Sequence, residues 1–438
     1  MISTICRALW GDISRKEAKK FSLLSAVFFF IIGTYWLMKS VKEAIFLTTV
    51  GPDYLAYAKI ASLIGLVIIL MLYAKLVDAL EKHNLVFLLC SIYSAIFIAI
   101  ACCLAHPVIG FANAQHHGLR LIGWFSYFAF ESMGTLIIPL FWGFVASTID
   151  PIAAKRGYPI ILIGAQVGAI GGAYLASHAQ LFGIVPLVLG GAASLIIVPF
   201  MLRLFMYHHP EDPVSTITPP SPKEATGALE GLRLLLSTPY LMGILVIGTV
   251  YDIIGEILHL QMMIIAHSVY PSPETMTSFM GTFGIAVNML SLFFAFAGTS
   301  FFIRRFGITF CLVAYPVTIA LAILCAWYFN GLWFFFAAMV ALKGLSYAFN
   351  NPCKELMYIP TSKDIKFKAK SWMDGFGSRS AKAFGAGVIA AFPVVQAGIN
   401  LVSYGSMVSL GIIAAWIPIA FLVGKTNSKL VEEGKIIE

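Results

Sequence analysis

The chain has 438 residues, 59% of them hydrophobic and only 11% charged, with a formal net charge of +8. A soluble domain carries about 25% charged residues, so this composition excludes an ordinary soluble protein and indicates that lipid solvates much of the chain. The basic residues are dispersed over many loops, which is typical of membrane topology signals and does not indicate binding to a nucleic acid polymer.

Twelve apolar segments are long enough to cross a membrane as helices. A helix needs about 20 apolar residues to span a hydrocarbon core of about 30 Å. Polar and apolar residues do not alternate in these segments, which favours helices over the strands of a membrane barrel. In chain order the predicted spans are 21–41, 55–75, 85–105, 120–147, 158–177, 181–206, 239–266, 276–303, 308–329, 332–350, 373–395 and 400–424. The first span exceeds a usual signal-peptide core and lacks a cleavage site, so we expect it to be retained.

Lysine and arginine residues concentrate in every second loop. The rich segments are the N-terminal tail, 75–83, 150–157, 203–238, 304–305, 351–372 and the C-terminal tail. By the positive-inside rule, both termini and all even-numbered loops are expected to be cytoplasmic. The proline-rich stretch 208–238 is the one obvious linker, so we predict two six-helix bundles, 1–207 and 239–438, as in carriers built from two such halves.

Charged side chains inside the apolar spans of the first half are functional candidates, because each costs about 2.5–3.5 kcal/mol to insert at mid-bilayer. Lys39, Lys42 and Glu43 share a helical face at the extracytoplasmic end of the first span. Their spacing favours binding of an anionic substrate by the two lysines. The alternative is that these side chains snorkel to the membrane interface. Glu131 lies in the fourth span between apolar residues. We interpret it as a cavity residue, as an ion-pair partner of a lysine from another span, or as both.

The seventh span contains three ionisable residues on one face. Asp252, Glu256 and His259 have the spacing i, i+4, i+7 of a single helical face. A proton relay, a set of partners for cavity lysines, and a polar seam between helices all fit this spacing. A lone histidine is more often a packing residue than a relay.

The tenth and eleventh spans contribute cations. Arg379 and Lys382 lie three residues apart among small residues, which allow helices to approach closely and leave room for a ligand. Lys343 in the tenth span belongs with them. Gathered in one cavity, these cations suit phosphate groups. Cations in both halves, with acids on the fourth and seventh spans, favour a carrier for a polyanion over a channel, which typically shows rings of repeated polar residues.

Motifs for enzyme chemistry do not occur in the sequence. The patterns G-x-x-x-x-G-K-[ST], G-x-S-x-G and H-E-x-x-H are all missing, so we expect no enzyme. The seven cysteines form no C-x-x-C pair and no histidine cluster accompanies them, so we expect no disulfide framework, no metal site and no cofactor.

Two other classes of function remain open. The first is a proton-coupled symporter of a nucleotide or another anionic metabolite, with Asp252, Glu256 and His259 as the proton relay. The second is a membrane protein without transport activity.

Five segments, in chain order, carry distinctive motifs: LWGDISRKEAKKF, KSVKEAIFLTTVGPD, WGFVASTIDPIAAKRGYPIILIGA, YPSPETMTSFMGTF and NPCKELMYIPTSKDIKFKAKSWMDGFGSRSAKAFGAG. Together they resemble the nucleotide transporters of obligate intracellular bacteria and plastids, the ATP/ADP translocase family. The last segment is similar to the family's K-E-x-x-Y-I-P block, its lysine-rich loop and the beginning of its eleventh span. At Glu256 the chain continues EILHLQ, where family members usually have Trp and Lys.

The resemblance implies a major-facilitator-like fold in a bacterial inner membrane and transport of nucleotides by alternating access. Family members exchange ATP for ADP with phosphate, or import nucleotides with protons. Four charged positions important in the family correspond to Lys42, Glu131, Glu256 and Lys382. We therefore expect ATP, ADP or a related nucleotide as substrate, with another phosphorylated metabolite as the alternative cargo. Membrane lipid surrounds the expected monomer.

The predicted mechanism has two bundles that rock around a central cavity. The residues expected to bind substrate are Lys39, Lys42, Glu131, Glu256, Lys343, Arg379 and Lys382. The cations hold the phosphates, an aromatic residue stacks on the base, and the two glutamates pair with cavity lysines when no substrate is bound. Substrate then replaces the carboxylates, which gives a binding energy that differs between the two states.

Overall fold

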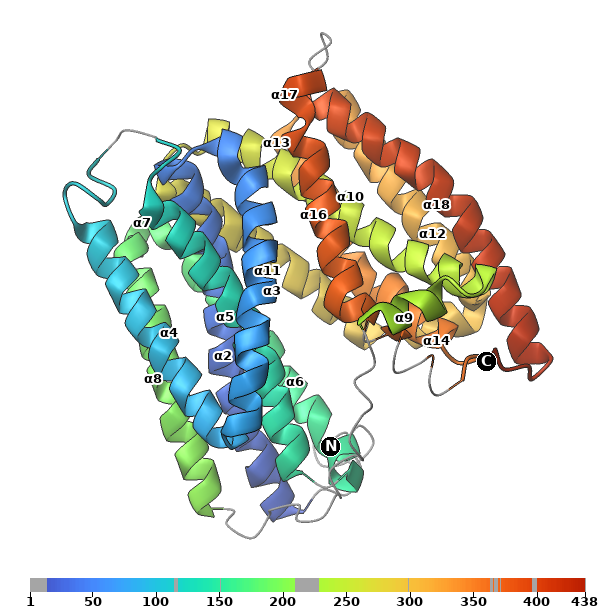
Figure 1. Cartoon of the computed structure of the whole chain (residues 1–438), viewed down its shortest axis with the longest axis horizontal. Coiled ribbons are helices and arrows are strands. Elements are labelled where there is room, and N and C mark those ends of the chain that lie inside the picture. The colour runs from blue at the N-terminus through green and yellow to red at the C-terminus, as the bar shows by residue number, and fades with distance from the viewer. Residues whose placement is uncertain are drawn as a thin grey trace. The chain divides into compact units, whose positions relative to one another are not determined.

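The computed structural model of the chain describes residues 14–113, 117–149, 151–208, 228–297, 299–362, 365, 369–370, 372–395 and 400–437 (Figure 1). The described residues are largely helical, with one isolated β-bridge among them, between Thr361 and Ile437. The elements are α2 (Arg15–Thr49), η1 (Pro52–Tyr54), α3 (Leu55–Ala79), α4 (Lys82–Ala105), α5 (Leu121–Thr148), α6 (Pro151–Ser177), α7 (Ala179–Phe182), α8 (Ile184–His208), α9 (Ala228–Leu235), α10 (Pro239–Val269), α11 (Pro273–Ala297), α12 (Thr299–Phe329), α13 (Leu332–Leu345), η2 (Ser346–Asn350), α14 (Asn351–Met357), η3 (Met373–Gly377), α16 (Ser378–Ala390), α17 (Phe392–Val395) and α18 (Leu401–Glu432).

Ten helices within the described residues are long and apolar enough to cross a membrane, and they coincide with predicted spans one to nine and twelve. The other two predicted spans, 332–350 and 373–395, consist of shorter segments. Each contains a π-helical turn, η2 in the former and η3 in the latter. A π-turn is wider than an α-helical turn and interrupts the regular repeat, so these spans are segmented. The predicted all-α membrane fold is confirmed.

The chain separates into two compact units, each described here by itself. Unit 1 consists of Met1–Tyr54, Ile64–Pro219 and Val269–Asn288; unit 2 consists of Leu55–Leu63, Pro220–Ser268 and Met289–Glu438. The first turns of α3 therefore group with unit 2, and α11 groups with unit 1 as far as Asn288. Much of the predicted linker 208–238 lies outside the described residues, and the division into bundles 1–207 and 239–438 stays a prediction.

Unit 1 is built around α2, which packs against α5, α6 and α8. Gly164, Gly168 and Gly172 recur every fourth residue on α6. A Cβ atom added to each would lie 2.3, 2.3 and 2.0 Å from a backbone oxygen of α2. Only glycine permits two helix backbones to approach this closely. This contact fixes the position of α2, the helix that carries Lys39 and Lys42.

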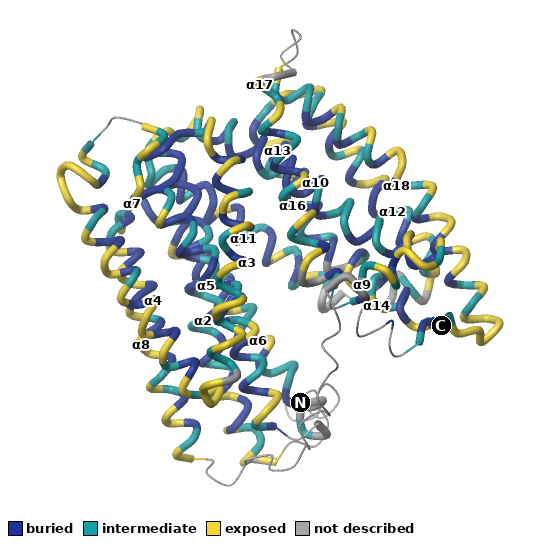
Figure 2. The backbone as a smooth tube through the Cα atoms, viewed as in Figure 1, coloured by how far each residue is buried: buried dark blue, intermediate teal, exposed yellow. Residues whose placement is uncertain are grey.

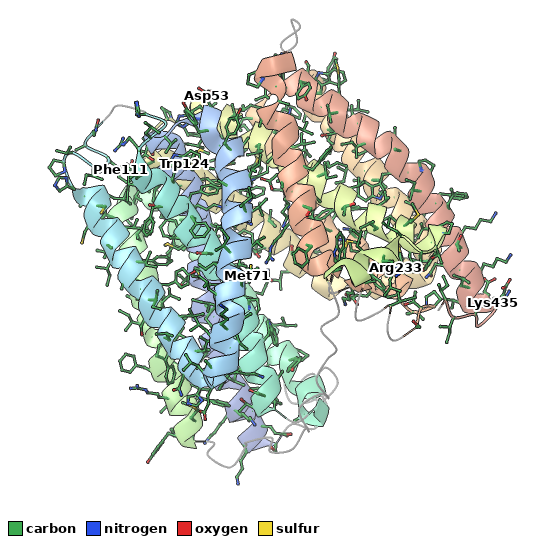
Figure 3. All side chains as sticks on the ribbon, viewed as in Figure 1. Asp53, Met71, Phe111, Trp124, Arg233 and Lys435 are labelled. Atoms are coloured by element: carbon green, nitrogen blue, oxygen red, sulfur yellow. The ribbon has the colours of Figure 1, made fainter. Side chains whose placement is uncertain are left out.

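Exposed residues recur along the helices, as the yellow segments of Figure 2 show. Many of these exposed residues have large apolar side chains. On α3, Ile64, Ile68 and Met71 are 62%, 60% and 67% exposed, and Met71 is labelled in Figure 3. Exposed apolar side chains in this number are solvated by hydrocarbon better than by water, and helices satisfy their own backbone hydrogen bonds there. The protein is a multi-pass membrane protein.

Candidate functional site

Lys42 is the centre of a buried charged cluster in unit 1. It lies on α2, and its side chain is 3% exposed. Its ammonium donates a hydrogen bond to Glu131 Oε2 on α5 and lies 3.3 Å from Glu43 Oε1. The ammonium also lies 4.4 Å from the centroid of the Tyr127 ring. Two carboxylates and a ring face therefore compensate one buried cation, and Lys42 and Glu43 do not snorkel to water.

Lys39, one turn earlier on α2, has an aromatic environment. Its ammonium lies 4.3 Å from the Trp36 ring centroid and 5.8 Å from that of Tyr35. Tyr35 packs over Gly134 of α5, where an added Cβ would lie 2.5 Å from the ring. The shared face predicted for Lys39 and Lys42 thus holds one cation against aromatic rings and one against carboxylates. Cation–π contacts of this kind are weaker than a buried ion pair.

Asp252 and Lys382 form the ion pair of α10 with α16 in unit 2. Asp252 Oδ1 lies 3.8 Å from Lys382 Nζ, and the Asp252 side chain is 9% exposed. Gly385, on α16 three residues after Lys382, makes this approach possible, because an added Cβ would lie 2.7 Å from the Ile253 carbonyl oxygen. The close contact between the two helices sets the distance between their charged side chains.

Glu256 has a partner that the sequence analysis did not single out. Lys59 Nζ lies 3.8 Å from Glu256 Oε1, and the two side chains are 10% and 7% exposed. Lys59 belongs to Leu55–Leu63, the part of α3 that groups with unit 2. Its sequence signal was present, since Lys59 is an ionisable residue inside the predicted span 55–75. Hydropathy alone could not assign it to Glu256.

Lys343 also contacts α10, at Tyr251 and Gly255. Its ammonium lies 5.2 Å from the centroid of the Tyr251 ring, and Lys354 of α14 lies 5.3 Å from that ring. Tyr251 and Lys354 were also missed, because neither an aromatic residue nor a lysine of a basic loop is conspicuous in the sequence. Arg379 and His259 are half-buried on α16 and α10.

The seven residues predicted to bind substrate therefore fall into several separate clusters. Lys42 meets Glu131 as expected for a carboxylate that pairs with a lysine of another span. Asp252 and Glu256 share a helical face, yet each has its own lysine partner, and the role of these residues as a relay or as substrate ligands stays a prediction. Among the described residues, no group of three or more His, Cys, Asp or Glu side chains could hold a metal ion.

Comparison with known sequences gives matches along nearly the whole chain. The family model described as "TLC ATP/ADP transporter" matches residues 2–342 and 332–426. The chain is 26% identical to ADP,ATP carrier protein 2, chloroplastic, of Arabidopsis thaliana, over 95% of this chain and 76% of that protein. It is 22% identical to ADP,ATP carrier protein 1 of Rickettsia bellii, over 95% of this chain and 94% of that protein.

Comparison with solved structures identifies the fold. A bacterial homologue of the iron transporter ferroportin superposes with a TM-score of 0.67 at 13% sequence identity, over 94% of this chain and 99% of that one. The nucleoside transporter NupG superposes with a TM-score of 0.61 at 17% identity, over 94% and 98%. These similarities confirm the predicted major-facilitator-like fold.

Proposed function

Because the chain belongs to the TLC ATP/ADP transporter family, we propose that it is a secondary transporter that exchanges ATP-type for ADP-type nucleotides by alternating access, and not an enzyme. Two lysine–carboxylate pairs inside the spans carry this proposal, Lys42–Glu131 in unit 1 and Lys382–Asp252 in unit 2, and each pair has one buried partner, Lys42 in the first and Asp252 in the second. Buried charges are costly in lipid-solvated helices and are retained there for function. Lysine ammonium groups are the natural ligands of phosphate oxygens.

The ion pairs supply the difference in binding energy that a transport cycle requires. In the absence of substrate, the carboxylate of Glu131 neutralises Lys42, and that of Asp252 neutralises Lys382. Nucleotide phosphates compete with these carboxylates for the ammonium groups. A state in which the phosphates replace the carboxylates is stabilised by substrate, and the empty state is stabilised by the ion pairs. Substrate thus shifts the equilibrium between two conformations by its differential affinity.

Proton-coupled symport is the second candidate, and one observation on Glu256 favours it. The Glu256 side chain is 7% exposed, and its Oε1 atom has no hydrogen-bond partner among the described residues. Carboxylates inside membrane spans are frequent members of proton relays in pumps and transporters. Uptake that requires an inward proton gradient and is lost in Glu256→Gln would favour symport over exchange.

The proposed setting is a bacterial inner membrane, with both termini in the cytoplasm and a monomer surrounded by lipid. The alternating distribution of Lys and Arg over the loops supports this orientation. In spheroplasts, we expect an antibody to reach a C-terminal epitope only after the inner membrane has been permeabilised.

The exchange is tested in proteoliposomes by the uptake of labelled ATP into vesicles loaded with ADP or with buffer alone. We expect uptake only into ADP-loaded vesicles, and its loss in Lys382→Gln. Lys429→Gln is the matched control, because it removes the same charge from a side chain that is 74% exposed on α18. No uptake with either loading would contradict ATP/ADP exchange.

A further inference from the structure

Cys311 and Cys353 form a buried pair of thiols in unit 2. Cys311 lies on α12 and Cys353 on α14, and both side chains are completely buried. Both are free thiols, and a hydrogen bond joins their side chains across the two helices. A buried cysteine usually packs as a small apolar side chain. Here two sulfur atoms are direct neighbours, and a disulfide would only have to shorten their separation to about 2 Å.

A break in α12 places Cys311 near the beginning of a helical stretch. Gly307 interrupts α12 with a φ of 79° and a ψ of 166°. The stretch that continues from Ile308 therefore has an N-terminus of its own, and Cys311 lies in its first turn. A helix N-terminus favours the thiolate form of a nearby cysteine, and the thiolate is the form that reacts with oxidants. Cys311 is therefore the expected nucleophile of the pair.

Cys353 lies on a short helix, whose opening would uncover the pair. α14 has seven residues and directly follows the π-helical turn η2. A helix of this length is unstable by itself and depends on its packing. Local opening of such a segment costs less free energy than global unfolding. A buried thiol is inert while it is covered, so opening of α14 controls the access of a small oxidant.

We propose that Cys311 and Cys353 form a site of reversible oxidation by hydrogen peroxide, at which a disulfide tethers α14 to α12 and slows transport. The site lies outside the substrate ligands of the proposed function, on which only its effect on transport rests. Segments 304–305 and 351–372 are expected to be cytoplasmic, and cytoplasmic disulfides are typically transient and redox-sensing. α14 also carries Lys354, whose ammonium lies 5.3 Å from the Tyr251 ring centroid, so the tether restrains a contact with α10.

One peroxide molecule oxidises the two thiols in two steps. The Cys311 sulfur attacks a peroxide oxygen, the O–O bond breaks, and a sulfenic acid and one water form. The Cys353 sulfur then attacks the Cys311 sulfur, the S–O bond breaks, and a disulfide and a second water form. The sulfur atoms lose two electrons, which reduce the peroxide, and the two thiol protons end in the two waters. A small-molecule dithiol reverses the reaction by thiol–disulfide exchange.

The test treats the purified full-length protein with hydrogen peroxide and maps the products by mass spectrometry. In the native protein, we expect a disulfide between the Cys311 and Cys353 peptides that dithiothreitol removes. Cys353→Ala should accumulate a sulfenic acid on Cys311, which dimedone traps, and Cys311→Ala should give neither product. Cys325→Ala is the matched control, because it removes an exposed cysteine of the same helix, and it should form the disulfide as the native protein does.

The effect on transport is measured in proteoliposomes with the same variants. Peroxide should lower nucleotide uptake by the native protein and by Cys325→Ala several-fold, and dithiothreitol should restore it. Cys311→Ala, which can form neither product, should keep its uptake after peroxide. Melting temperatures of the reduced proteins show whether each variant is folded, and Cys311→Ser provides a second variant without the thiol.

The results separate the oxidation site from the transport proposal. Native protein whose two thiols remain free after peroxide would overturn the oxidation site and leave nucleotide exchange standing. A Cys311–Cys353 disulfide that forms while uptake stays at its untreated level would overturn the tether's effect on transport. A disulfide that forms in a protein without nucleotide uptake in its reduced state would support the oxidation site and contradict the proposed function.

Discussion

Lys42 and Glu131 form a buried ion pair between α2 and α5, although 89 residues separate them in the chain. The pair depends on the backbone contact of α2 with α6, which fixes the position of α2 in unit 1. The Lys42 side chain is 3% exposed and that of Glu131 is 24% exposed, so the ammonium group has lost nearly all contact with solvent and depends on the carboxylate for compensation. This relationship predicts both a stability effect and a transport effect.

Loss of Lys42 should destabilise the protein strongly. In Lys42→Gln, the carboxylates of half-buried Glu131 and buried Glu43 lose this cation, and removal of one partner of a buried pair costs about 3–5 kcal/mol. The double variant Lys42→Gln/Glu131→Gln removes one charge of each sign, so its loss should be smaller than the sum of the single losses by about 1 kcal/mol or more. Unfolding free energies in detergent provide the measurement, and strictly additive losses would show that the two side chains do not interact.

Exchanging the two charges of the Lys59–Glu256 pair should restore the transport and the folded yield that either single substitution removes. Lys59→Glu places two buried acids near each other, and Glu256→Lys places two buried bases there, so each single variant should lose most of its transport and folded yield. The double variant Lys59→Glu/Glu256→Lys restores opposite charges at this position, and its yield should return to at least half of the native value. Yield and nucleotide uptake check this. A double variant no better than the worse single variant would contradict the pairing.

Two glycines of α16 provide a matched test of helix packing. Gly385→Ala should reduce transport severely, because the added Cβ would lie 2.7 Å from the Ile253 carbonyl oxygen and push Lys382 away from Asp252. Gly387→Ala is the control on the same helix, since an added Cβ meets nothing within 4 Å. Both changes have the same effect on helix propensity. Uptake in proteoliposomes should fall several-fold in the first variant and stay near native in the second; equal uptake in the two would refute the packing argument.

The sequence predicts the fold well because lipid imposes simple physical rules. A span needs about 20 apolar residues, and loop charges fix orientation, so nine consecutive spans and the last could be located without any structure. The segmentation of the spans at 332–350 and 373–395 could not be predicted. A π-turn depends on one extra residue per turn and on the tertiary contacts of residues such as Ser346, and apolar composition carries no signal for either.

The residues of the site were easier to predict than their partners. Glu131, Asp252 and Lys382 are conspicuous because charge is costly in an apolar span. Their pairing depends on which helices pack together, and spacing along the chain does not determine that. Lys59 was overlooked although the same rule applies to it, and Tyr251 carries no charge, so its association with Lys343 appears only in three dimensions.

The most direct test of the account is the affinity of Glu131→Gln for ATP, measured together with its exchange rate. If phosphates and carboxylates compete for Lys42, removal of the Glu131 charge removes a competitor. The account predicts an ATP dissociation constant about tenfold lower than that of the native protein, together with slower exchange, because the substrate is held and the empty state has lost its ion pair. A dissociation constant that is unchanged or higher in a folded Glu131→Gln variant would contradict the competition and with it the central role of the Lys42–Glu131 pair.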